Sequence, residues 1–452
     1  MGLGRLVYPI PEIERGSFVK GIANNQSAAV FVCILLICIC IFVFAVHYLN
    51  SDQSEGAAIP SATSSSRMST GEIAYISNRS GLAEIWLLDL ATGTERQLTE
   101  TDCSHVASTG GYVPEDYVAG VQYFTWSPDG SRIAYLTTCA HVTSQARLNV
   151  YDLETGSTIS IAIRASESSY PSWSPSGDRF VFTLASHLPR RGIYIAKLDG
   201  PGEVEIEPIA GTARDECLHG CYFAEWAPDG QYIAYRGPYV RLRLPGAGSR
   251  TYVSIVDLDG NHIVYGTAGD FRVSWIHEPA PGGLAWSRDS HYLAIATMDG
   301  YTVAHLVLAE ITDGEATMAE AFGIWQHSSV SAGLAPFGPG FRYPVFSPDG
   351  ETLYFVSLWP DSEDIRQSFG TIYSIPTQDL LGDSSPNVQI ISPEDQLAGF
   401  PSLSPDGKWL LYVVKEGAAT EIWIQATDGT YRQRLVGDGF INTRPAWRPS
   451  GG

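Results

Sequence analysis

Charged side chains are scarce in this chain, and basic ones are scarcer than acidic ones. Only 17 % of its 452 residues are charged, and 28 basic residues stand against 49 acidic ones, so the formal net charge is −21. With so little charge, long solvent-exposed helices are not expected to dominate, because their outer faces need polar cover. The excess of acid disfavours general nucleic-acid binding, because it repels phosphate backbones.

Aromatic residues and turn formers are abundant by contrast. The chain holds 11 Trp, 23 Tyr and 17 Phe, together with 45 Gly and 27 Pro. Aromatic side chains favour strands, and Gly and Pro interrupt them, so this mixture predicts many short strands joined by turns. Length alone would allow two or three domains, but some all-β folds also reach this size as one domain.

One long run lacks charged residues, and it lies near the N-terminus. Residues 28–48 (AAVFVCILLICICIFVFAVHY) contain no Asp, Glu, Lys or Arg. As a helix this run would be about 31 Å long, enough to cross a bilayer core of about 30 Å. A cleaved signal peptide is the alternative, but its apolar region is normally shorter and ends at a small-residue cleavage site. We therefore predict a retained transmembrane anchor.

Flanking basic residues predict the orientation of this anchor. Arg5, Arg15 and Lys20 precede it, and the next basic residue is Arg67. The positive-inside rule keeps residues 1–27 in the cytoplasm as a short head and places the remainder outside, in the periplasm or the extracellular space. Residues 49–70 are rich in Ser and Ala and are interpreted as a flexible linker.

A five-residue phrase recurs seven times after the linker. It occurs as WSPDG at 126–130, WSPSG at 173–177, WAPDG at 226–230, WSRDS at 286–290, FSPDG at 346–350, LSPDG at 403–407 and WRPSG at 447–451. Pro, Asp and Gly in this order are typical of a tight turn, so we assign structural roles to Asp129, Gly130, Asp229, Gly230, Asp349, Gly350, Asp406 and Gly407. Such a spacing predicts a propeller or an array.

Each phrase leads into an apolar strand, followed by a second strand that often ends in D-G or T-G and by a more variable one. Four strands per repeat make one propeller blade. The first unit begins at Gly71 and lacks an inner strand, whereas residues 444–452 supply that strand alone. The sequence therefore predicts a seven-bladed, all-β propeller over residues 71–452, closed by its C-terminal strand.

These phrases resemble the TolB-type, WD40-like propeller repeat, whose pattern is PxWSPDGxxIAF followed by IYxxDxDG. The resemblance covers about residues 71–452, and it implies a fold that serves many functions. TolB itself has six blades and an N-terminal α/β domain, so a direct role in the Tol–Pal system is not expected. A head, one helix and an outer propeller also resemble dipeptidyl-peptidase IV, but no G-x-S-x-G nucleophile motif occurs here.

Long loops on one face of the predicted propeller are the expected binding surface. The stretch 236–250 carries Arg236, Arg241, Arg243 and Arg250 without any acid. It is interpreted either as a contact for an acidic partner or as a solvated hairpin. Trp275, His277, Trp325 and His327 are candidate partner-binding residues on neighbouring loops, with packing between blades as the alternative.

Four cysteines lie beyond the membrane run, and an even number outside the cytoplasm is typical of disulfides. Three pairings are open. We favour Cys103 with Cys139, which fall in adjacent loops on one face, and Cys217 with Cys221, which share a loop. The histidines show no fixed metal-ligand spacing, and neither a metal nor a cofactor is predicted.

No catalytic signature occurs, so a non-catalytic extracytoplasmic scaffold that recognises a protein or glycan is the favoured function. The alternative is a propeller-based lyase or hydrolase acting on carbohydrates. A sensor that signals through its cytoplasmic head is a third hypothesis, weakened by the absence of a recognisable module there.

Overall fold

The computed structural model describes sixteen stretches of the chain, all of them after the predicted linker. They are residues 71–103, 118–139, 146–165, 170–184, 192–198, 204–209, 221–236, 240–241, 249–250, 252–267, 283–299, 303–312, 315–325, 341–358, 369–381 and 386–450. The predicted head, membrane segment 28–48 and linker lie outside the described residues. In the stretches above, no helix is long and apolar enough to cross a membrane.

Antiparallel sheets make up the described part of the unit formed by residues 68–452: five of four strands, one of eight and one of two. The first sheet, in the order β3-β2-β1-β30, contains β1 (Glu72–Ser77), β2 (Glu84–Asp89), β3 (Glu95–Gln97) and β30 (Asn442–Trp447). The second contains β4 (Gly120–Trp126), β5 (Arg132–Thr138), β6 (Ala146–Asp152) and β7 (Thr158–Ala165). The third contains β8 (Ser172–Trp173), β9 (Arg179–Leu184), β10 (Gly192–Leu198) and β11 (Val204–Pro208).

The remaining sheets follow in chain order. The fourth contains β12 (Tyr222–Trp226), β13 (Tyr232–Arg236), β16 (Tyr252–Asp257) and β17 (His262–Thr267), and β14 (Val240–Arg241) pairs separately with β15 (Ser249–Arg250). The fifth contains β18 (Leu284–Trp286), β19 (Tyr292–Asp299), β20 (Val303–Thr312) and β21 (Glu315–Trp325). The eight-stranded sheet contains β22 (Phe341–Phe346), β23 (Thr352–Leu358), β24 (Gly370–Pro376), β25 (Gln389–Ile390), β26 (Ala398–Leu403), β27 (Trp409–Glu416), β28 (Ala419–Ala426) and β29 (Arg432–Val436). A short 3-10 helix, η2 (Thr377–Leu380), follows β24.

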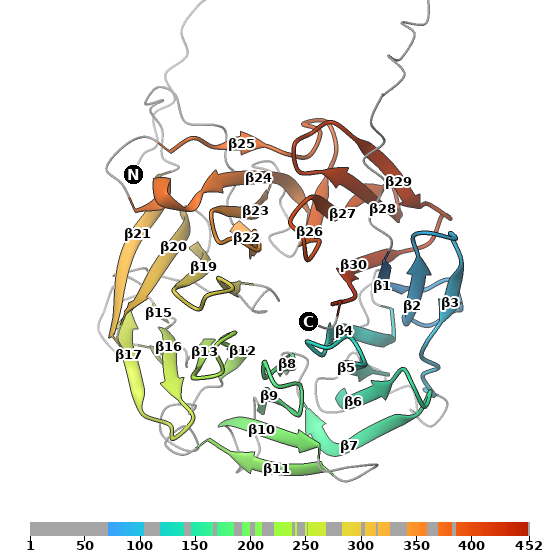
Figure 1. Ribbon diagram of the computed structural model, residues 1–452, viewed down its shortest axis with the longest axis horizontal. Helices are drawn as coiled ribbons and strands as arrows, with labels where there is room; N and C mark the ends of the chain where they lie inside the picture. Colours follow the sequence, from blue (N-terminus) through green and yellow to red (C-terminus); the bar gives the residue numbers. More distant parts are fainter. Residues whose placement is uncertain are drawn as a thin grey trace, which may run out of the picture. The chain divides into compact units, whose positions relative to one another are not determined.

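These sheets are arranged as the blades of a β-propeller. Figure 1 shows them radiating from a common centre, with β4, β8, β12, β22, β26 and β30 toward the middle and β3, β7, β11, β17, β21 and β29 at the rim. Within the eight-stranded sheet, β24 and β26 meet at one residue pair, Gly370 with Ala398. These six inner strands come from distant parts of the sequence and converge on one axis, where their residues can meet.

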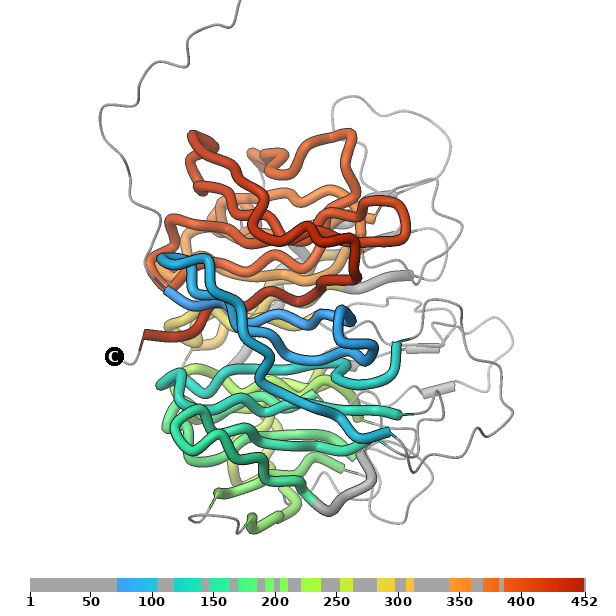
Figure 2. The backbone as a smooth tube through the Cα atoms, turned by 90° about the vertical axis from the view of Figure 1, so that its right-hand side faces the viewer, coloured from blue at the N-terminus to red at the C-terminus, as the bar shows by residue number. Residues whose placement is uncertain are grey.

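The first sheet joins the two ends of the described chain. Strand β30 pairs antiparallel with β1, with Trp447 opposite Ile73 and Asn442 opposite Ser77. Figure 2 shows this red C-terminal strand running beside the blue N-terminal strands. The sequence predicts the closing strand over residues 444–452, whereas β30 runs from Asn442 to Trp447, because its pairing with β1 already begins at Asn442 opposite Ser77. Closure removes the open edge that β1 would otherwise present.

The core lies between neighbouring sheets, because each sheet buries both faces. One buried cluster combines Ile85 and Leu87 of β2 with Phe124 of β4 and Ile133 of β5. Repeated tryptophans bond across the same junctions: the indole N–H of Trp173 donates to the carbonyl of Thr125 at 3.2 Å. Equivalent bonds run from Trp286 to Glu225 and from Trp447 to Ser402, each at 3.2 Å.

The repeated phrase forms the turn between the first and second strands of a sheet. The hydroxyl of Ser127 donates to Oδ1 of Asp129 at 2.6 Å, and the backbone N–H of Ser131 donates to the same oxygen at 3.0 Å. Gly130 has φ +68°, and a Cβ there would lie 2.4 Å from the carbonyl oxygen of Pro449. In this copy of the phrase, these contacts are those of a tight turn.

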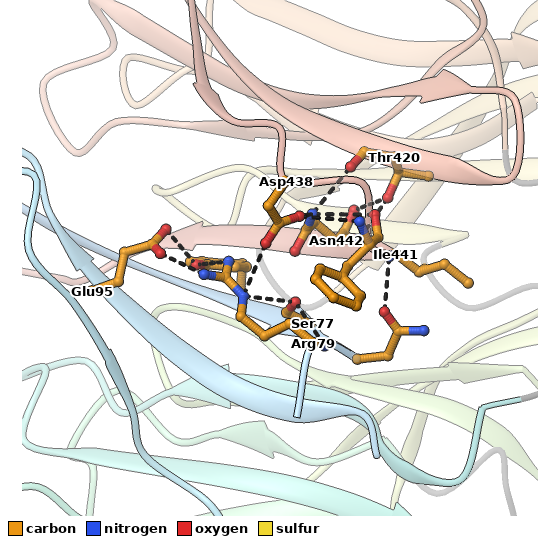
Figure 3. Close-up of polar contacts among 10 residues, drawn as sticks. Ser77, Arg79, Glu95, Thr420, Asp438, Ile441 and Asn442 are labelled. Carbon is orange, nitrogen blue, oxygen red and sulfur yellow. Dashed lines mark hydrogen bonds and ion pairs between the residues drawn. The ribbon is translucent and has the colours of Figure 1, made fainter. Parts of the chain in front are cut away.

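An ion-pair network holds the first sheet against the last one (Figure 3). Arg79, just after β1, contacts Oε2 of Glu95 at 2.5 Å and Oδ2 of Asp438 at 3.1 Å. Its guanidinium lies 4.5 Å from the ring centroid of Trp86. Burial, followed by the hydrogen bond to Glu95, raises the pKa of the Tyr75 hydroxyl, which lies beside this network.

Buried polar contacts of β30 extend the same network. The side-chain amide of Asn442 donates to the carbonyl of Thr420 at 3.1 Å and to Oδ1 of Asp438 at 2.8 Å. The backbone N–H of Ile441 donates to Oδ1 of Asn78 at 2.9 Å. We call Arg79, Glu95, Thr420, Asp438 and Asn442 the ring seam; they connect strands from opposite ends of the described chain (Figure 3).

Candidate ligand-binding site on the propeller axis

One position of the repeat carries aromatic and cationic residues near the propeller axis. It lies three residues before the repeated Trp, Phe or Leu, at or just before the inner strand. Its seven occupants are Tyr123, Tyr170, Phe223, Gly283, Tyr343, Phe400 and Arg444. Five of the seven are aromatic, one is a cation and one has no side chain. We call the five aromatic residues and Arg444 the axial collar.

The aromatic members of the axial collar contact one another between successive repeats of the phrase. The ring centroids of Tyr123 and Tyr170 are 4.4 Å apart, and those of Tyr170 and Phe223 are 5.3 Å apart. On the other side, the Tyr343 and Phe400 centroids are 4.6 Å apart. Distances of this size are those of attractive ring pairs. Because the partners of each pair come from different repeats of the phrase, the collar lies where the inner strands converge.

Arg444 connects these aromatic side chains. Its guanidinium carbon lies 5.3 Å from the Tyr123 centroid, 5.8 Å from that of Tyr170 and 5.1 Å from that of Phe400. A cation within about 6 Å of an aromatic face is attracted by the ring quadrupole. Arg444 is half-buried, and its guanidinium lies among these rings.

The backbone of the axial collar is strained. Phe223, Tyr343, Phe400 and Arg444 have φ values of 51°, 50°, 53° and 52°. Pairing registers shift at the same places in β12, β22, β26 and β30, as expected for β-bulges. A bulky residue in this left-handed region costs on the order of 1–3 kcal/mol, and such strain concentrates at functional sites. Four strained residues at one repeat position therefore mark this position as a candidate site.

A carboxyl group lies close to the collar. Glu225 is on β12, two residues after Phe223, and its charge is one of the causes that raise the pKa of Tyr123. Burial raises the pKa of Glu225 to about 7, against the opposing effect of a hydrogen bond with Ser172. An acid with this pKa changes its charge near neutral pH.

Gly283 occupies the same repeat position as the collar residues but has no side chain. The guanidinium of Arg236 fills the space. A Cβ added to Gly283 would lie 2.2 Å from Nη2 of Arg236, which is the last residue of β13. The same Nη2 donates a hydrogen bond to the carbonyl of Ala296 in the next sheet. Arg236 is among the sequence-predicted contact residues, but its guanidinium turns toward the collar position.

The other sequence-predicted contact residues are only partly described. Arg241 and Arg250 lie on the two-stranded sheet, where Arg241 is opposite Ser249, and Trp325 ends β21 opposite Val303. This pairing leaves both interpretations of 236–250, the partner contact and the solvated hairpin, as predictions. Arg243, Trp275, His277 and His327 lie outside the described residues.

The predicted cysteine pairing can be followed at one pair. Cys103 and Cys139 are joined by a disulfide with a Cα–Cα distance of 5.2 Å. Cys221 is disulfide-bonded and buried, while Cys217, its predicted partner, lies outside the described residues. Across the described stretches, no group of three or more His, Cys, Asp or Glu side chains is placed to hold a metal ion.

The axial collar was missed by the sequence analysis, although a signal exists. Six of the seven repeats have Tyr, Phe or Arg three residues before the repeated Trp, Phe or Leu, as in YPSW at 170–173 and RPAW at 444–447. Extending the alignment of the seven phrases by three residues toward the N-terminus would have shown it. The contact between Arg236 and Gly283 has no such signal, because it depends on how two sheets approach.

No protein-family model and no curated protein sequence matches the chain. Solved structures do. TolB from Acinetobacter baumannii is 15 % identical over 84 % of this chain and 66 % of that one, with a TM-score of 0.42. A structure from an analysis of two prolyl endopeptidases is 12 % identical over 83 % of this chain and 49 % of that one, with a TM-score of 0.51.

An oligogalacturonate lyase in complex with manganese is also similar, at 13 % identity over 78 % of this chain and 85 % of that chain, with a TM-score of 0.48. The chain thus spans about two thirds of the TolB chain and half of the prolyl endopeptidase chain. At such identities these likenesses concern the fold alone, and the proteins include enzymes.

Proposed function

We propose that this chain is a non-catalytic recognition module whose ligand binds at the axial collar of a seven-bladed propeller. The blade number follows if the two sets of four strands in the eight-stranded sheet, joined at one residue pair, count as one blade each. The ligand is a protein segment or a glycan. Aromatic side chains are frequent anchors at such interfaces, because they offer large rigid surfaces.

One observation carries this proposal: Arg444 is held at φ 52° among three aromatic rings on the axis. An arginine with a left-handed backbone conformation destabilises the fold. Asn or Gly would adopt the same conformation at a lower energetic cost. An arginine at this place is accounted for when its cation serves a ligand.

We also propose that the propeller acts outside the cytoplasm, tethered by residues 28–48. The support is the sequence alone: a run without charge that is long enough to span a bilayer, and basic residues on its N-terminal side. A tethered recognition module would meet its ligand at the membrane surface.

The test uses the full-length protein in mild detergent and an extract of the cell envelope that holds the ligand. Arg444→Asn removes the cation while keeping a residue that tolerates positive φ. Arg96, exposed on β3, supplies the control Arg96→Met with the same loss of charge. We expect wild type and R96M to retain one ligand, and R444N to retain at least tenfold less of it. The recovered ligand should be chemically unchanged.

A propeller enzyme acting on carbohydrates is the second candidate, and Glu225 favours it. A carboxyl with a pKa of about 7 beside a tyrosine has the properties of a general acid or base. The same experiment separates the two functions. If the ligand is recovered in cleaved form, and Glu225→Gln abolishes the cleavage, the protein is an enzyme rather than a recognition module.

A further inference from the structure

We propose that Arg444 binds a carboxylate of a protein segment that enters the axial collar. This inference deepens the proposed function and rests on it, because it names the chemical group that the recognition module holds. Arg444 lies in a bulge of β30, between Thr443 and Ala446, which pair with Ile76 and Ala74 of β1. From this bulge its guanidinium lies among the rings of the collar.

The guanidinium of Arg444 has no polar partner in the described stretches. It forms neither a hydrogen bond nor an ion pair with any residue there. Unlike Nε of Arg236, no side-chain nitrogen of Arg444 is both buried and without a partner in the same stretches. These nitrogens are therefore accessible, and a guanidinium can only donate hydrogen bonds. The collar thus presents a row of unused donors.

Other half-buried arginines of the described chain contact an oxygen atom. They are Arg79 with Glu95, Arg132 with Asp152, Arg179 with Asp178, Arg236 with Ala296, Arg432 with Tyr412 and Arg448 with Glu72. Glu225, near the collar, does not take this role for Arg444, since no ion pair joins the two among the described residues. Burial also raises the pKa of Glu225 to about 7, so a proton neutralises part of its charge. The partner of Arg444 is therefore sought outside the fold.

The collar rings leave little aromatic face on which a sugar ring can stack. Tyr170 and Phe223 are stacked on each other, with their ring planes 14° apart. Tyr343 and Phe400 lie with centroids 4.6 Å apart, and the guanidinium of Arg444 lies near the Phe400 ring as well. A ligand therefore meets a cation among packed rings. This arrangement favours the carboxylate of a narrow protein segment over a glycan.

A carboxylate matches this cation in shape and charge. The planar fork of a guanidinium donates parallel hydrogen bonds to both oxygens of one carboxylate. A chain with a net charge of −21 repels a multiply charged anion, such as phosphate, more strongly than a single carboxylate. The expected ligand is therefore a protein segment that presents one carboxylate, at its C-terminus or on a side chain.

The test titrates the full-length protein in mild detergent with three peptides, using calorimetry. Acetyl-Ala-Ala-Ala-Phe carries a terminal carboxylate, its C-terminal amide carries none, and acetyl-Ala-Asp-Ala-Phe amide carries one on a side chain. At least one carboxylate peptide is expected to bind tenfold more tightly than the neutral amide. The tighter of the two shows whether the carboxylate comes from a chain end or from a side chain.

Glucuronate and inorganic phosphate are titrated in the same way and should bind more weakly than the better carboxylate peptide. Tighter binding of glucuronate would show a glycan site, and tighter binding of phosphate a general anion site, and either result would overturn the inference. Equal binding of the three peptides, or binding of none of them, would overturn it as well.

Arg444→Asn should weaken binding of the carboxylate peptides at least tenfold and leave binding of the amide within twofold of wild type. Asn tolerates positive φ, so this loss does not reflect a weakened backbone. Arg444→Lys keeps the charge without the fork and should bind with an intermediate affinity. An arginine that only held the rings together would change Tm without distinguishing the acid from the amide. Carboxylate binding by R444N within threefold of wild type would therefore contradict the inference.

Arg432→Met is the matched control. Its guanidinium also lies over a ring, 4.2 Å from the Trp423 centroid, but it donates hydrogen bonds to Tyr412 and Gln396. R432M should therefore lower Tm while carboxylate binding stays within twofold of wild type. Arg96→Met serves in its place if R432M does not fold, as checked by circular dichroism.

Capture of the envelope ligand separates this inference from the proposed function. If R444N loses that ligand while wild type binds the acid and the amide peptides equally, the carboxylate site is wrong and the recognition module stands. If R444N retains the envelope ligand while carboxylate binding still depends on Arg444, the carboxylate site stands and the collar is not where that ligand is recognised.

Discussion

Glu225 is a carboxyl group whose environment makes its ionisation unfavourable. Burial raises its pKa from 4.5 to about 7, and a hydrogen bond with Ser172 acts in the opposite direction. Because the folded state holds the proton more tightly than the unfolded state, the contribution of Glu225 to stability is fully present below pH 4.5. It is lost as pH rises toward 7.

Glu225→Gln should therefore remove part of the pH dependence of unfolding. Between pH 5 and pH 8 the wild type is expected to lose about 2–3 kcal/mol more than E225Q, the size implied by this pKa shift. Urea unfolding at both pH values measures the difference. Parallel pH dependence in the two proteins would show that Glu225 ionises normally.

The repeated turn makes a second prediction at the level of single residues. Gly130→Ala should destabilise the protein by more than 2 kcal/mol, because φ is +68° and the new Cβ would lie 2.4 Å from the Pro449 carbonyl oxygen. Gly93→Ala is the control, since its φ of +69° is the same and nothing lies within 4 Å of its Cβ. Its expected cost is about 1 kcal/mol.

Thermal and urea unfolding of both variants would measure this pair. Both glycines have a left-handed conformation, so the difference between the two stability losses measures the effect of the contact with the Pro449 carbonyl oxygen alone. Equal losses would mean that the loop before Pro449 moves away at little cost.

At the scale of elements, the ring seam depends on one buried amide. Asn442 on β30 is 0 % exposed, and its side chain bonds to Thr420 and Asp438. Asn442→Ala leaves buried acceptors without a donor, so we expect a loss of about 2–4 kcal/mol. Equilibrium unfolding in urea is the measurement.

Asn261→Ala provides the comparison for this seam variant. The side-chain amide of Asn261 also donates to a carboxylate, Oδ2 of Asp257 at 2.8 Å, but on an exposed hairpin. Its removal should cost under about 1 kcal/mol, because water replaces the lost bond. If N442A also loses less than about 1 kcal/mol of stability, β30 is held in place by its apolar residues alone.

At the scale of the whole molecule, repetition explains what could be predicted from sequence. The turn chemistry of WSPDG and its variants is local, so strand order and the pairing of β30 with β1 follow from counting units along the chain. Strand ends are less certain: β30 begins at Asn442, where its pairing with Ser77 and its contacts to Thr420 begin.

Side chains that meet through the ring closure were not predicted. The axial collar needs the seven repeats to be superimposed around one axis, which no single segment reveals. Arg236 was selected for its place in a basic stretch, yet its position depends on the absence of a side chain at Gly283. The predicted contact residues Arg243, Trp275, His277 and His327 stay a prediction.

The pairing of β1 with β30 has a consequence for biosynthesis. Asn78 and Ile441, which bond across this junction, are 363 residues apart in sequence. At 5–20 residues per second, a ribosome needs about 20–70 s to make the intervening chain. During this time the nascent polypeptide carries β1 without its partner, so the open edge of that strand stays available for wrong pairing until synthesis reaches β30.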